Sequence, residues 1–400
     1  MASSHSREQF DIAIVGGGPS GRIAALALAQ QGLSCVLIAP TLDQQDCRTT
    51  ALWQKSIDLL RDIGVWPAIE GNAEALKKMR MIDSTGRLFR APEVVFDCSE
   101  LGLEEFGFNI LNSELNVFLE KACAAQPSLE MIADTVETAE FGDEQAILFT
   151  SGGMIISTSL AVAADGRKST LREAAGIKVK SWSYPQVAVV LNLEHRLPHQ
   201  QISTEFHTST GPFTLVPLPG RQSSLVCVET AEGAAKLLAM TDEELETELE
   251  RRAHSILGSF KLASKPQSFP LAGLTATSLV GPRLALVGET AHVFPPIGAQ
   301  GLNLSMRDIR DLTTIVAAAR HSHADIGSRP LLSSYEKKRF SDIRSRTNAV
   351  DVLNRSLLTE FLPVQAVRSA GMYLTGKLGP LRRILMREGL APGTAFQLHR

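Results

Sequence analysis

Three glycines near the N-terminus have the spacing that the phosphates of a dinucleotide require. Gly16, Gly18 and Gly21 form a G-x-G-x-x-G pattern between the apolar run 11–15 and the alanine-rich run 23–29. We expect Gly16 to allow a tight turn, Gly18 to let the backbone approach a pyrophosphate, and Gly21 to let a helix pack closely on a strand. The positive end of that helix would face the anion. This order of strand, turn and helix predicts a bound dinucleotide; the alternative is a glycine-rich turn without a ligand.

Two further segments place polar residues at the ends of apolar runs. Asp165 and Gly166 follow the run 161–164, and Ser169 is a suitable N-cap for the helix expected after them. Taken alone, this segment is equally typical of a simple joint between a strand and a helix.

The other segment begins with Gly288 and Glu289, directly after the run 284–287. A loop rich in Pro and Gly follows, and a helix is expected to begin near Gly301, with Leu302, Met306, Ile309 and Leu312 on one face. Unpaired amide groups at such a helix start suit a ring that becomes an anion on reduction.

Composition excludes several classes of protein. With 40 basic and 43 acidic residues in 400, the chain has no basic excess that would suit nucleic acid. The five cysteines form no C-x-x-C pair, and the nine histidines include no H-E-x-x-H, so we expect reduced cysteines and no metal. No apolar run has the length of a membrane span. We therefore expect a cytoplasmic protein, or one attached peripherally to the inner face of the membrane.

The periodicity of the apolar residues predicts two interleaved lobes. Residues 33–38 should form a second buried strand and residues 51–63 a helix, whereas residues 186–231 alternate with a period of two, which is typical of antiparallel sheet, with a hairpin at 219–222. Thr241 and Glu244 form a capping box that should start another helix. Parallel-sheet character returns at 284–287, so the first lobe is interrupted by the antiparallel one. Only one G-x-G-x-x-G is present, which argues against a separate nicotinamide-binding domain.

The segments described above resemble the three signatures of the FAD-dependent aromatic hydroxylases, the group A flavoprotein monooxygenases. Residues 16–21, Asp165 with Gly166, and Gly288 with Glu289 and residues 295–303 match in order and spacing over nearly the whole chain. Within that group, residues 48–52, 184–190, 212–219 and 294–303 resemble the ring hydroxylases of ubiquinone biosynthesis, the UbiH and UbiF type.

The resemblance implies an α/β fold, in which a Rossmann-like FAD-binding domain carries an inserted antiparallel-sheet substrate domain and a C-terminal helical tail. The FAD-binding domain would comprise residues 8–82, 111–175 and 273–320, the substrate domain residues 83–110 and 176–272, and the helical region residues 321–400. The implied reaction hydroxylates the ring of a prenylated phenol through a flavin C4a-hydroperoxide. FAD would be the cofactor, NAD(P)H the transient electron donor and O₂ the co-substrate, and the enzyme would work within a quinone-biosynthesis complex.

The resemblance also implies roles for individual residues. Arg48 would reach the flavin side of the cofactor, Asp165 would lie near the pyrophosphate and NAD(P)H, and Glu289 would take the ribityl or phosphate position. Pro296 and Gly298 would form the environment of the flavin ring, and no acid or base is assigned. The full cofactor set is Gly16, Gly18, Pro19, Ser20, Gly21, Arg48, Asn112, Val136, Asp165, Gly166, Gly288, Glu289, Gly298, Gln300, Gly301, Leu302 and Asn303.

The antiparallel lobe should cover the flavin and offer one apolar face to the substrate. The residues expected there are Phe206, Phe213, Leu215, Pro217, Val226 and Val228. Alternation cannot say which face meets a ligand, so the same residues are also typical of a plain core.

Four positions depart from the usual pattern or leave alternatives open. Ala39 stands where the family usually has an acidic residue for the adenosine ribose, and Asp43 or Asp46 replaces it only if the following loop folds back. Glu289 is one methylene longer than the usual aspartate. Arg22 either adds a cation near the phosphates or points to solvent, and we expect solvent. His292 is either an acid or base or a structural hydrogen-bonding group beneath the cofactor, and we expect the structural role.

The chain after Val350 mixes apolar and basic residues. It either lies on anionic lipid or packs on the first lobe; the residues concerned are Leu353, Leu357, Leu358, Phe361, Leu362, Met372, Lys377, Arg382, Arg383 and Arg387. Three other functions fit the same scaffold. They are hydroxylation of a small phenol, reduction of isoprenoid double bonds, and a non-catalytic lipid-binding role in a quinone-biosynthesis complex.

Overall fold

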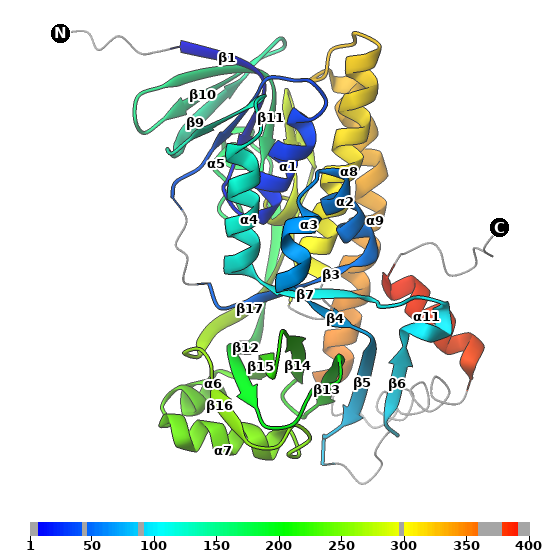
Figure 1. Cartoon of the computed structure of the whole chain (residues 1–400). Helices are drawn as coiled ribbons and strands as arrows, with labels where there is room; N and C mark the ends of the chain where they lie inside the picture. Colours follow the sequence, from blue (N-terminus) through cyan, green and yellow to red (C-terminus); the bar gives the residue numbers. More distant parts are fainter. Residues whose placement is uncertain (1–6, 42–45, 87–91, 296–299, 359–377, 391–400) are drawn as a thin grey trace.

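A computed structural model describes residues 7–41, 46–86, 92–295, 300–358 and 378–390. The chain forms an upper lobe and a lower lobe, each built on its own large sheet, with a small sheet between them (Figure 1). The upper lobe contains both the start of the chain and the long helices α8 (Gln300–His321) and α9 (Arg329–Leu358).

The sheet of the upper lobe has the order β18-β19-β11-β1-β2-β8, and β9 and β10 extend it through β11. Its central strands are parallel, and their apolar runs are buried on both faces, as predicted for 11–15, 33–38, 161–164 and 284–287. The strands are β1 (Arg7–Val15), β2 (Cys35–Ile38), β8 (Leu129–Ile132), β9 (Val136–Phe141), β10 (Ala146–Thr150), β11 (Ile155–Ala163), β18 (Val280–Gly281) and β19 (Leu284–Leu286).

Three of these parallel strands end next to one another. Val15 of β1 is in register with Ala163 of β11, and Ala163 is in register with Leu286 of β19. The turns that follow them therefore begin at the same edge of the sheet, where open α/β sheets bind their ligands.

The lower sheet has the order β20-β17-β12-β15-β14-β13-β5-β6, with β16 paired to β12. It confirms the antiparallel sheet predicted for 186–231 and the hairpin at 219–222, since Leu218 faces Gln222 across β14 and β15. The boundary between the two domains was predicted to lie between residues 82 and 83. Because all of β5 pairs with β13, residues 78–83 belong to the lower sheet, and the change of lobe comes before β5. The strands are β5 (Lys78–Asp83), β6 (Val94–Asp97), β12 (Val179–His195), β13 (Ile202–His207), β14 (Pro212–Leu218), β15 (Gln222–Thr230), β16 (Phe260–Leu262), β17 (Gln267–Ala276) and β20 (His292–Val293).

The small sheet corrects the helix predicted for 51–63. Residues Thr49–Trp53 form β3, which pairs with β7 (Gly107–Leu111), and β7 also pairs with β4 (Glu74–Leu76). The helix α2 starts only at Gln54 and ends at Asp62. Pairing with a strand that lies far away in the sequence overrides the local helical pattern at 51–53.

Three other helices begin where local signals predicted. Thr241 and Glu244 form both bonds of a capping box at the start of α7, Ser169 caps α5, and α8 starts at Gln300. The remaining helices are α1 (Pro19–Ala29), α3 (Trp66–Ile69), α4 (Asn112–Ala124), α5 (Thr170–Ala174), α6 (Ala231–Leu238), α7 (Asp242–Arg252) and α11 (Gly379–Leu390), with 3-10 turns η1 (Glu70–Asn72), η2 (Cys98–Leu101) and η3 (Gly288–Thr290). No helix in the described ranges is long and apolar enough to cross a membrane.

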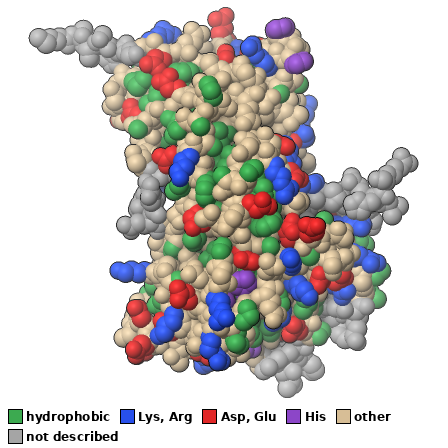
Figure 2. Space-filling model, in the orientation of Figure 1, with side chains coloured by type: hydrophobic (Ala, Val, Ile, Leu, Met, Phe, Trp, Pro, Cys, Tyr) green, Lys and Arg blue, Asp and Glu red, His purple; other side chains and the backbone are tan. Residues whose placement is uncertain are grey.

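Each lobe has its own core. The upper core surrounds the parallel strands, whereas the lower core lies between the sheet and helices α6 and α7. All five cysteines are free thiols, and burial raises the pKa of Cys35, Cys123 and Cys227 to about 12, as expected of packing residues. On the face drawn in Figure 2, cationic and anionic side chains are interspersed, in keeping with the balanced composition.

Candidate functional site

The first turn at the sheet edge has the geometry expected of a phosphate-binding turn. Gly16 has a φ of 120°, and a Cβ there would lie 2.2 Å from the carbonyl oxygen of Ala164. At Gly21 a Cβ would lie 1.8 Å from the carbonyl oxygen of Gly16, so only glycine lets α1 pack this closely. At Gly18, in contrast, a Cβ would meet no protein atom within 4 Å. Gly18 is the N-cap of α1, Pro19 begins the helix, and no described side chain caps it.

The second and third turns are joined by hydrogen bonds. The amide of Gly166 donates to the hydroxyl of Thr290 at 3.1 Å, and that hydroxyl donates to Asp165 at 3.3 Å. The buried Arg172 donates to the carbonyl of Thr290 at 2.9 Å. A Cβ on Gly288, which has a φ of 64°, would approach both Ser20 and Ser305. The three turns and the start of α8 therefore form one continuous site. Thr290, Arg172 and Ser305 were not predicted, although Thr290 directly follows Glu289 of the third signature.

Four charged side chains of alternating sign lie along this site. Arg48 donates to both carboxylate oxygens of Asp46 at 2.8 Å, and Arg167 donates to Glu289 at 3.2 Å. The bond with Asp46 raises the pKa of Arg48, and the charge of Glu289 adds to that increase. Burial alone would raise the pKa of Asp46, but Arg48 and Asn112 outweigh it and lower the value.

Arg48 and Asn112, which were both predicted to bind the cofactor, lie next to each other, since the backbone amide of Asn112 donates to the carbonyl of Arg48. Val136 begins β9 and is buried in the upper core. Asp46 was one candidate to replace the acidic residue that usually binds the adenosine ribose. Its carboxylate already accepts hydrogen bonds from Arg48 and Asn112, so it is not available for that role in this structure. Asp43 lies outside the described residues.

The start of α8 carries the next predicted residues. Asn303 is buried and accepts hydrogen bonds from the amide of Trp53 and the hydroxyl of Ser56, while its own amide donates to Ala51. It therefore ties α8 to the junction of β3 and α2. Gln300, Gly301 and Leu302 form the first turn of α8. Pro296 and Gly298 lie outside the described residues, so their role at the flavin ring stays a prediction.

His292 lies in a buried cluster of charges directly beneath the third turn. Its Nε2 lies 2.6 Å from Asp308, which also accepts the amide of Gly288 at 3.2 Å and the guanidinium of Arg339 at 2.7 Å. All three side chains are almost fully buried. This arrangement supports the structural role expected for His292. Asp308 was not predicted, although an acidic residue between Leu304 and Leu312 on the apolar stripe of α8 was a signal that could have revealed it.

Arg22 contradicts the expectation that it points to solvent. Its side chain is 6% exposed, and it donates to the carbonyl of Asn116 and to Glu120 on α4. It therefore joins α1 to α4, and it is turned neither to water nor to the phosphates. The physical reason is that α4 packs against α1 and offers both a carbonyl and a carboxylate.

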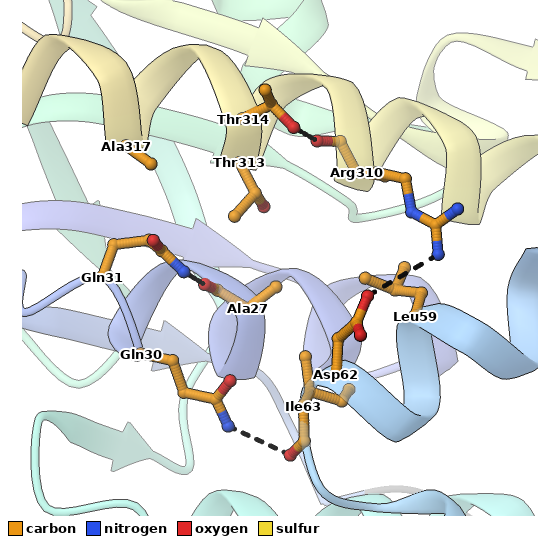
Figure 3. Close-up of a pocket in the computed structure, with 10 residues that line it drawn as sticks. All are labelled: Ala27, Gln30, Gln31, Leu59, Asp62, Ile63, Arg310, Thr313, Thr314 and Ala317. Carbon is orange, nitrogen blue, oxygen red and sulfur yellow. Dashed lines mark hydrogen bonds and ion pairs between the residues drawn. The ribbon is translucent and has the colours of Figure 1, made fainter.

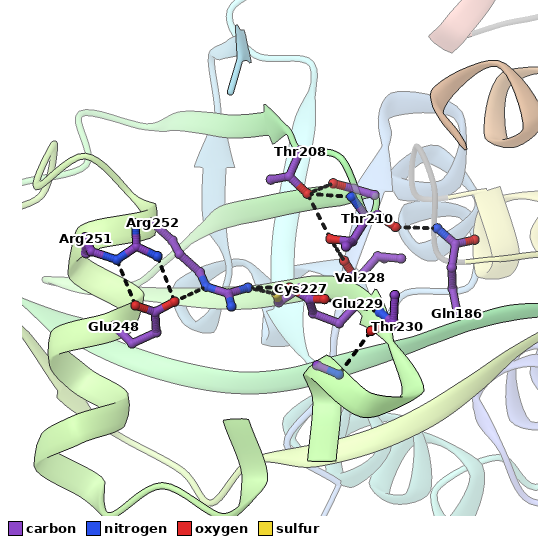
Figure 4. A network of polar contacts seen from close by, with 12 residues as sticks. Gln186, Thr208, Thr210, Cys227, Val228, Glu229, Thr230, Glu248, Arg251 and Arg252 are labelled. Atoms are coloured by element: carbon purple, nitrogen blue, oxygen red, sulfur yellow. Dashed lines mark hydrogen bonds and ion pairs between the residues drawn. The ribbon is translucent and has the colours of Figure 1, made fainter. Parts of the chain in front are cut away.

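The predicted substrate residues do not share one face of the lower sheet. Phe206, Phe213 and Leu215 are fully buried with α6 and α7, and Pro217 follows the same alternation along β14. Cys227 and Glu229 of β15 are turned toward Arg252 of α7, as Figure 4 shows. Since successive residues of a strand point to opposite faces, Val226 and Val228 point away from α7. The expectation of a single apolar face was therefore wrong, since a period of two cannot tell which face meets the helices.

The face that carries Val226 and Val228 looks toward the upper lobe. Val226 is in register with Val190, and Val228 with Ala188, while Ala188 faces Phe269 on β17. Arg48 lies 5.2 Å from the centre of the Phe269 ring, and Asn192 of β12 donates to the carbonyl of Cys47. We call this the inner face, defined by Ala188, Val190, Val226, Val228 and Phe269.

A polar groove between α1, α2 and α8 lies apart from this site (Figure 3). It is lined by the end of α1 rather than by its start, with Gln30, Gln31, Asp62 and Arg310 among its residues. The three turns do not contribute to it, so it is not the candidate site.

Comparison with known proteins decides the family. Residues 9–347 match the family described as FAD binding domain. The chain belongs to this family. It is 32% identical to the ubiquinone hydroxylase UbiL of Rhodospirillum rubrum, over 95% of this chain and 89% of that protein. It is 29% identical to the 3-demethoxyubiquinol 3-hydroxylase of Escherichia coli, over 96% and 99% of the two chains. The p-nitrophenol 4-monooxygenase PnpA of Pseudomonas putida has the same fold, with a TM-score of 0.78 at 18% identity, over 99% and 100% of the two chains.

The residues at the sheet edge fit FAD, as the family requires. The open space at Gly18 and the uncapped start of α1 provide a cradle for a pyrophosphate, whereas Gly16 and Gly21 are needed for packing alone. The start of α8 and the turn at Gly288 lie beside this cradle. The chain is thus an FAD-dependent enzyme of the aromatic hydroxylase type, and this confirms the predicted family, fold class and cofactor.

Glu289 provides a test of how the third turn meets the cofactor. We expect Glu289→Gln to weaken FAD binding by about 1–2 kcal/mol, because the amide keeps the shape but loses a charge-assisted hydrogen bond. Glu289→Asp keeps the charge and should bind FAD at least as well as Glu289→Gln. FAD affinity would be measured by fluorescence titration of the apoprotein.

The matched control is Arg167→Gln, which breaks the same half-exposed ion pair from its other side. It should leave FAD affinity close to that of the wild type, since such pairs contribute little. Equal losses in the Glu289→Gln and Arg167→Gln proteins would mean that the ion pair, and not a contact of Glu289 with FAD, matters.

Proposed function

We propose that the protein hydroxylates the aromatic ring of a prenylated phenol in ubiquinone biosynthesis, using FAD and O₂. The observation that carries the proposal is the match with the UbiL hydroxylase over nearly the full length of both chains. The convergence of the three turns opposite the inner face supports it, because a phenol between them would lie against the flavin. When bound, FAD supplies the redox chemistry that activates oxygen.

The residues of this chain would bind, orient and shield the reactants. The amides at the start of α1 and the turn at Gly288 would hold the cofactor. Asn303 holds the first turn of α8, at the edge of the site, against Trp53. The small apolar side chains of the inner face would cover one side of the phenol and exclude water.

The proposed reaction is tested with the FAD-loaded protein and 2-prenylphenol as the probe. NAD(P)H oxidation and O₂ uptake should rise when the phenol is added, and mass spectrometry should detect a product heavier by one oxygen atom. A product heavier by two hydrogen atoms would point to double-bond reduction. No turnover of any phenol would contradict the proposed function.

We also propose that helix α11 contacts the membrane in which such a substrate dissolves. One side of α11 is held by the protein, where Met386 is buried and Arg382 pairs with Glu100 at 2.7 Å. Leu385 is nearly half exposed on one flank of the helix, as is Leu378 just before it, and Arg383 is exposed on the opposite flank. The contacts of Arg382 and Met386 show that one side of α11 packs on the protein. The exposed leucines and Arg383 favour contact of the remaining surface with lipid.

Reversing the charges of Arg383 and Arg387 to Glu should weaken binding to anionic vesicles at least about 30-fold, because the loss of each cation alone costs about 1 kcal/mol. Vesicle co-sedimentation at low and high salt measures this, and salt should weaken the wild type as well. The control reverses Lys236 and Arg251, which are exposed cations on α6 and α7. Binding that is unaffected by salt or by the α11 changes would refute the lipid contact.

A further inference from the structure

Two aromatic side chains border the open part of the inner face. In the hydrophobic cluster on this face, Tyr184, Val226 and Phe269 are only partly buried. The members that the protein covers almost completely are Ala188, Val190, Val228 and Leu271. A ligand that reaches the inner face therefore meets two aromatic rings and one branched apolar side chain.

Strand pairing places Tyr184 within the candidate site. Near its start, β17 carries Phe269, whose ring centre is 5.2 Å from the guanidinium carbon of Arg48. Near its end, residues 274–275 pair with β20, which follows the turn at Gly288. Between these two positions β17 pairs with residues 182–183 of β12, and Tyr184 comes next along that strand. Tyr184 therefore lies between the Arg48 end and the Gly288 end of the site.

The backbone of β12 is irregular at this residue. Pairing with β17 stops after Ser183 and resumes at Val187, so residues 184–186 of β12 stand opposite one residue of β17. Pro185, in the middle of this stretch, has no N–H to donate to a neighbouring strand. Bulges of this kind change the direction of a side chain and are frequent next to active sites. The bulge thus gives Tyr184 a direction that regular pairing would not give it.

Neighbouring residues hold Tyr184 from both sides of the bulge. The indole N–H of Trp182 donates to the Tyr184 hydroxyl oxygen at 2.8 Å. A Cβ on Gly273 would lie 2.2 Å from two ring atoms of Trp182, so only glycine lets the indole lie directly on the backbone of β17. On the other side, Gln186 is buried and donates to the carbonyl of Thr210 at 2.6 Å (Figure 4). The ring of Tyr184 is therefore partly exposed but fixed in place.

We propose that Tyr184 determines specificity for an aromatic substrate: its ring, fixed by Trp182, packs against the ring of the phenol and orients that ring toward the cofactor. This role rests on the proposed function. Aromatic pairs prefer offset-stacked or edge-to-face arrangements with ring centres about 4.5–7 Å apart. A protein ring that is already held in place therefore selects both the flatness and the orientation of the ligand ring. Tyr184 acts by packing alone and takes no proton from the substrate.

Equilibrium binding to the oxidised, FAD-loaded protein tests the contact, with 2-prenylphenol and 2-prenylcyclohexanol as the probes. The two probes share the tail and the hydroxyl group, but the ring of the second is neither flat nor aromatic. The wild type should bind the phenol more tightly, and Tyr184→Leu should reduce that ratio about 2- to 10-fold, the usual range for an aromatic pair. Tyr184→Phe keeps the ring and should keep the preference. Phe213→Leu, which removes a ring from the face turned to α6 and α7, is the control and should also keep it.

Product formation shows whether the contact also orients the ring. The FAD-loaded protein is reduced anaerobically with dithionite and mixed with O₂ and saturating 2-prenylphenol, so that neither the natural electron donor nor weaker binding affects the result. Tyr184→Leu should form less hydroxylated product per flavin and release more H₂O₂, whereas Tyr184→Phe should match the wild type. Trp182→Phe keeps a ring over Gly273 but loses the N–H donor, and its product yield should fall in the same direction.

Two results would overturn the contact with Tyr184: an unchanged binding ratio in the Tyr184→Leu protein, or an equal loss of preference in the Phe213→Leu protein. A wild-type product yield in the Trp182→Phe protein would overturn the part assigned to Trp182. A wild type whose preference for the phenol depends on Tyr184, but which forms no product from any phenol, would count against the proposed function instead.

Discussion

Replacing Gly18 with valine is expected to abolish FAD binding while leaving the protein folded. The Cβ position at Gly18 meets no protein atom within 4 Å, so the new side chain clashes with nothing in the chain itself. It would occupy the space through which the backbone approaches the pyrophosphate. The purified Gly18→Val protein should be colourless, and its thermal unfolding should match that of the apo wild type.

Gly21 offers the opposite behaviour in the same turn. A methyl group at Gly21 would lie 1.8 Å from the carbonyl oxygen of Gly16, so α1 must move away from β1. Gly21→Ala should therefore destabilise the apoprotein itself by about 3 kcal/mol, at the upper end of the usual cost of overpacking. Urea unfolding of both apoproteins distinguishes the two effects. Stoichiometric FAD in the Gly18→Val protein would show that the pyrophosphate lies elsewhere.

The sequence predicted those parts of the fold that local chemistry determines. The buried parallel strands are continuous apolar runs, and the helix starts carry caps such as Ser169 and Thr241. The family resemblance implied that the three turns serve one site. Their convergence depends only on β1, β11 and β19 being neighbours, which the register confirms.

Features that depend on distant partners could not be predicted. Residues 51–53 became a strand because β7 pairs with them, and Arg22 became buried because α4 supplies its acceptors. The substrate residues were assigned to one face, although alternation is the same for a face covered by helices and a face turned to the cofactor. Phe213 and Val226 are both apolar, and only the position of α7 separates them.

Removing the carboxylate of Asp308 should have the second large effect, on stability and on FAD together. Asp308 is fully buried, and its carboxylate is hydrogen-bonded to Arg339, to His292 and to the amide of Gly288. Asp308→Asn leaves the cation of Arg339 without its closest buried anion, and breaking such a pair typically costs 3–5 kcal/mol. Because Arg339 keeps Asp342 at 2.7 Å, we expect about 3 kcal/mol from urea unfolding. The turn at Gly288 also loses an acceptor, so FAD should bind more weakly.

The pH dependence provides an independent check of the same residue. Burial alone would raise the pKa of Asp308, but the charges of His292 and Arg339 outweigh it and hold the value below that of an ordinary aspartate. A lowered pKa contributes stability that is present above the unfolded value of about 3.9 and is lost as the pH falls through the folded value. The wild type should therefore lose this stability in acid, whereas the Asp308→Asn protein has none of it to lose. Asp58→Asn, which breaks the half-exposed pair with Arg61, is the control and should cost at most about 1 kcal/mol. Equal losses in the two variants, with FAD affinity unchanged, would show that Asp308 does not hold the turn at Gly288.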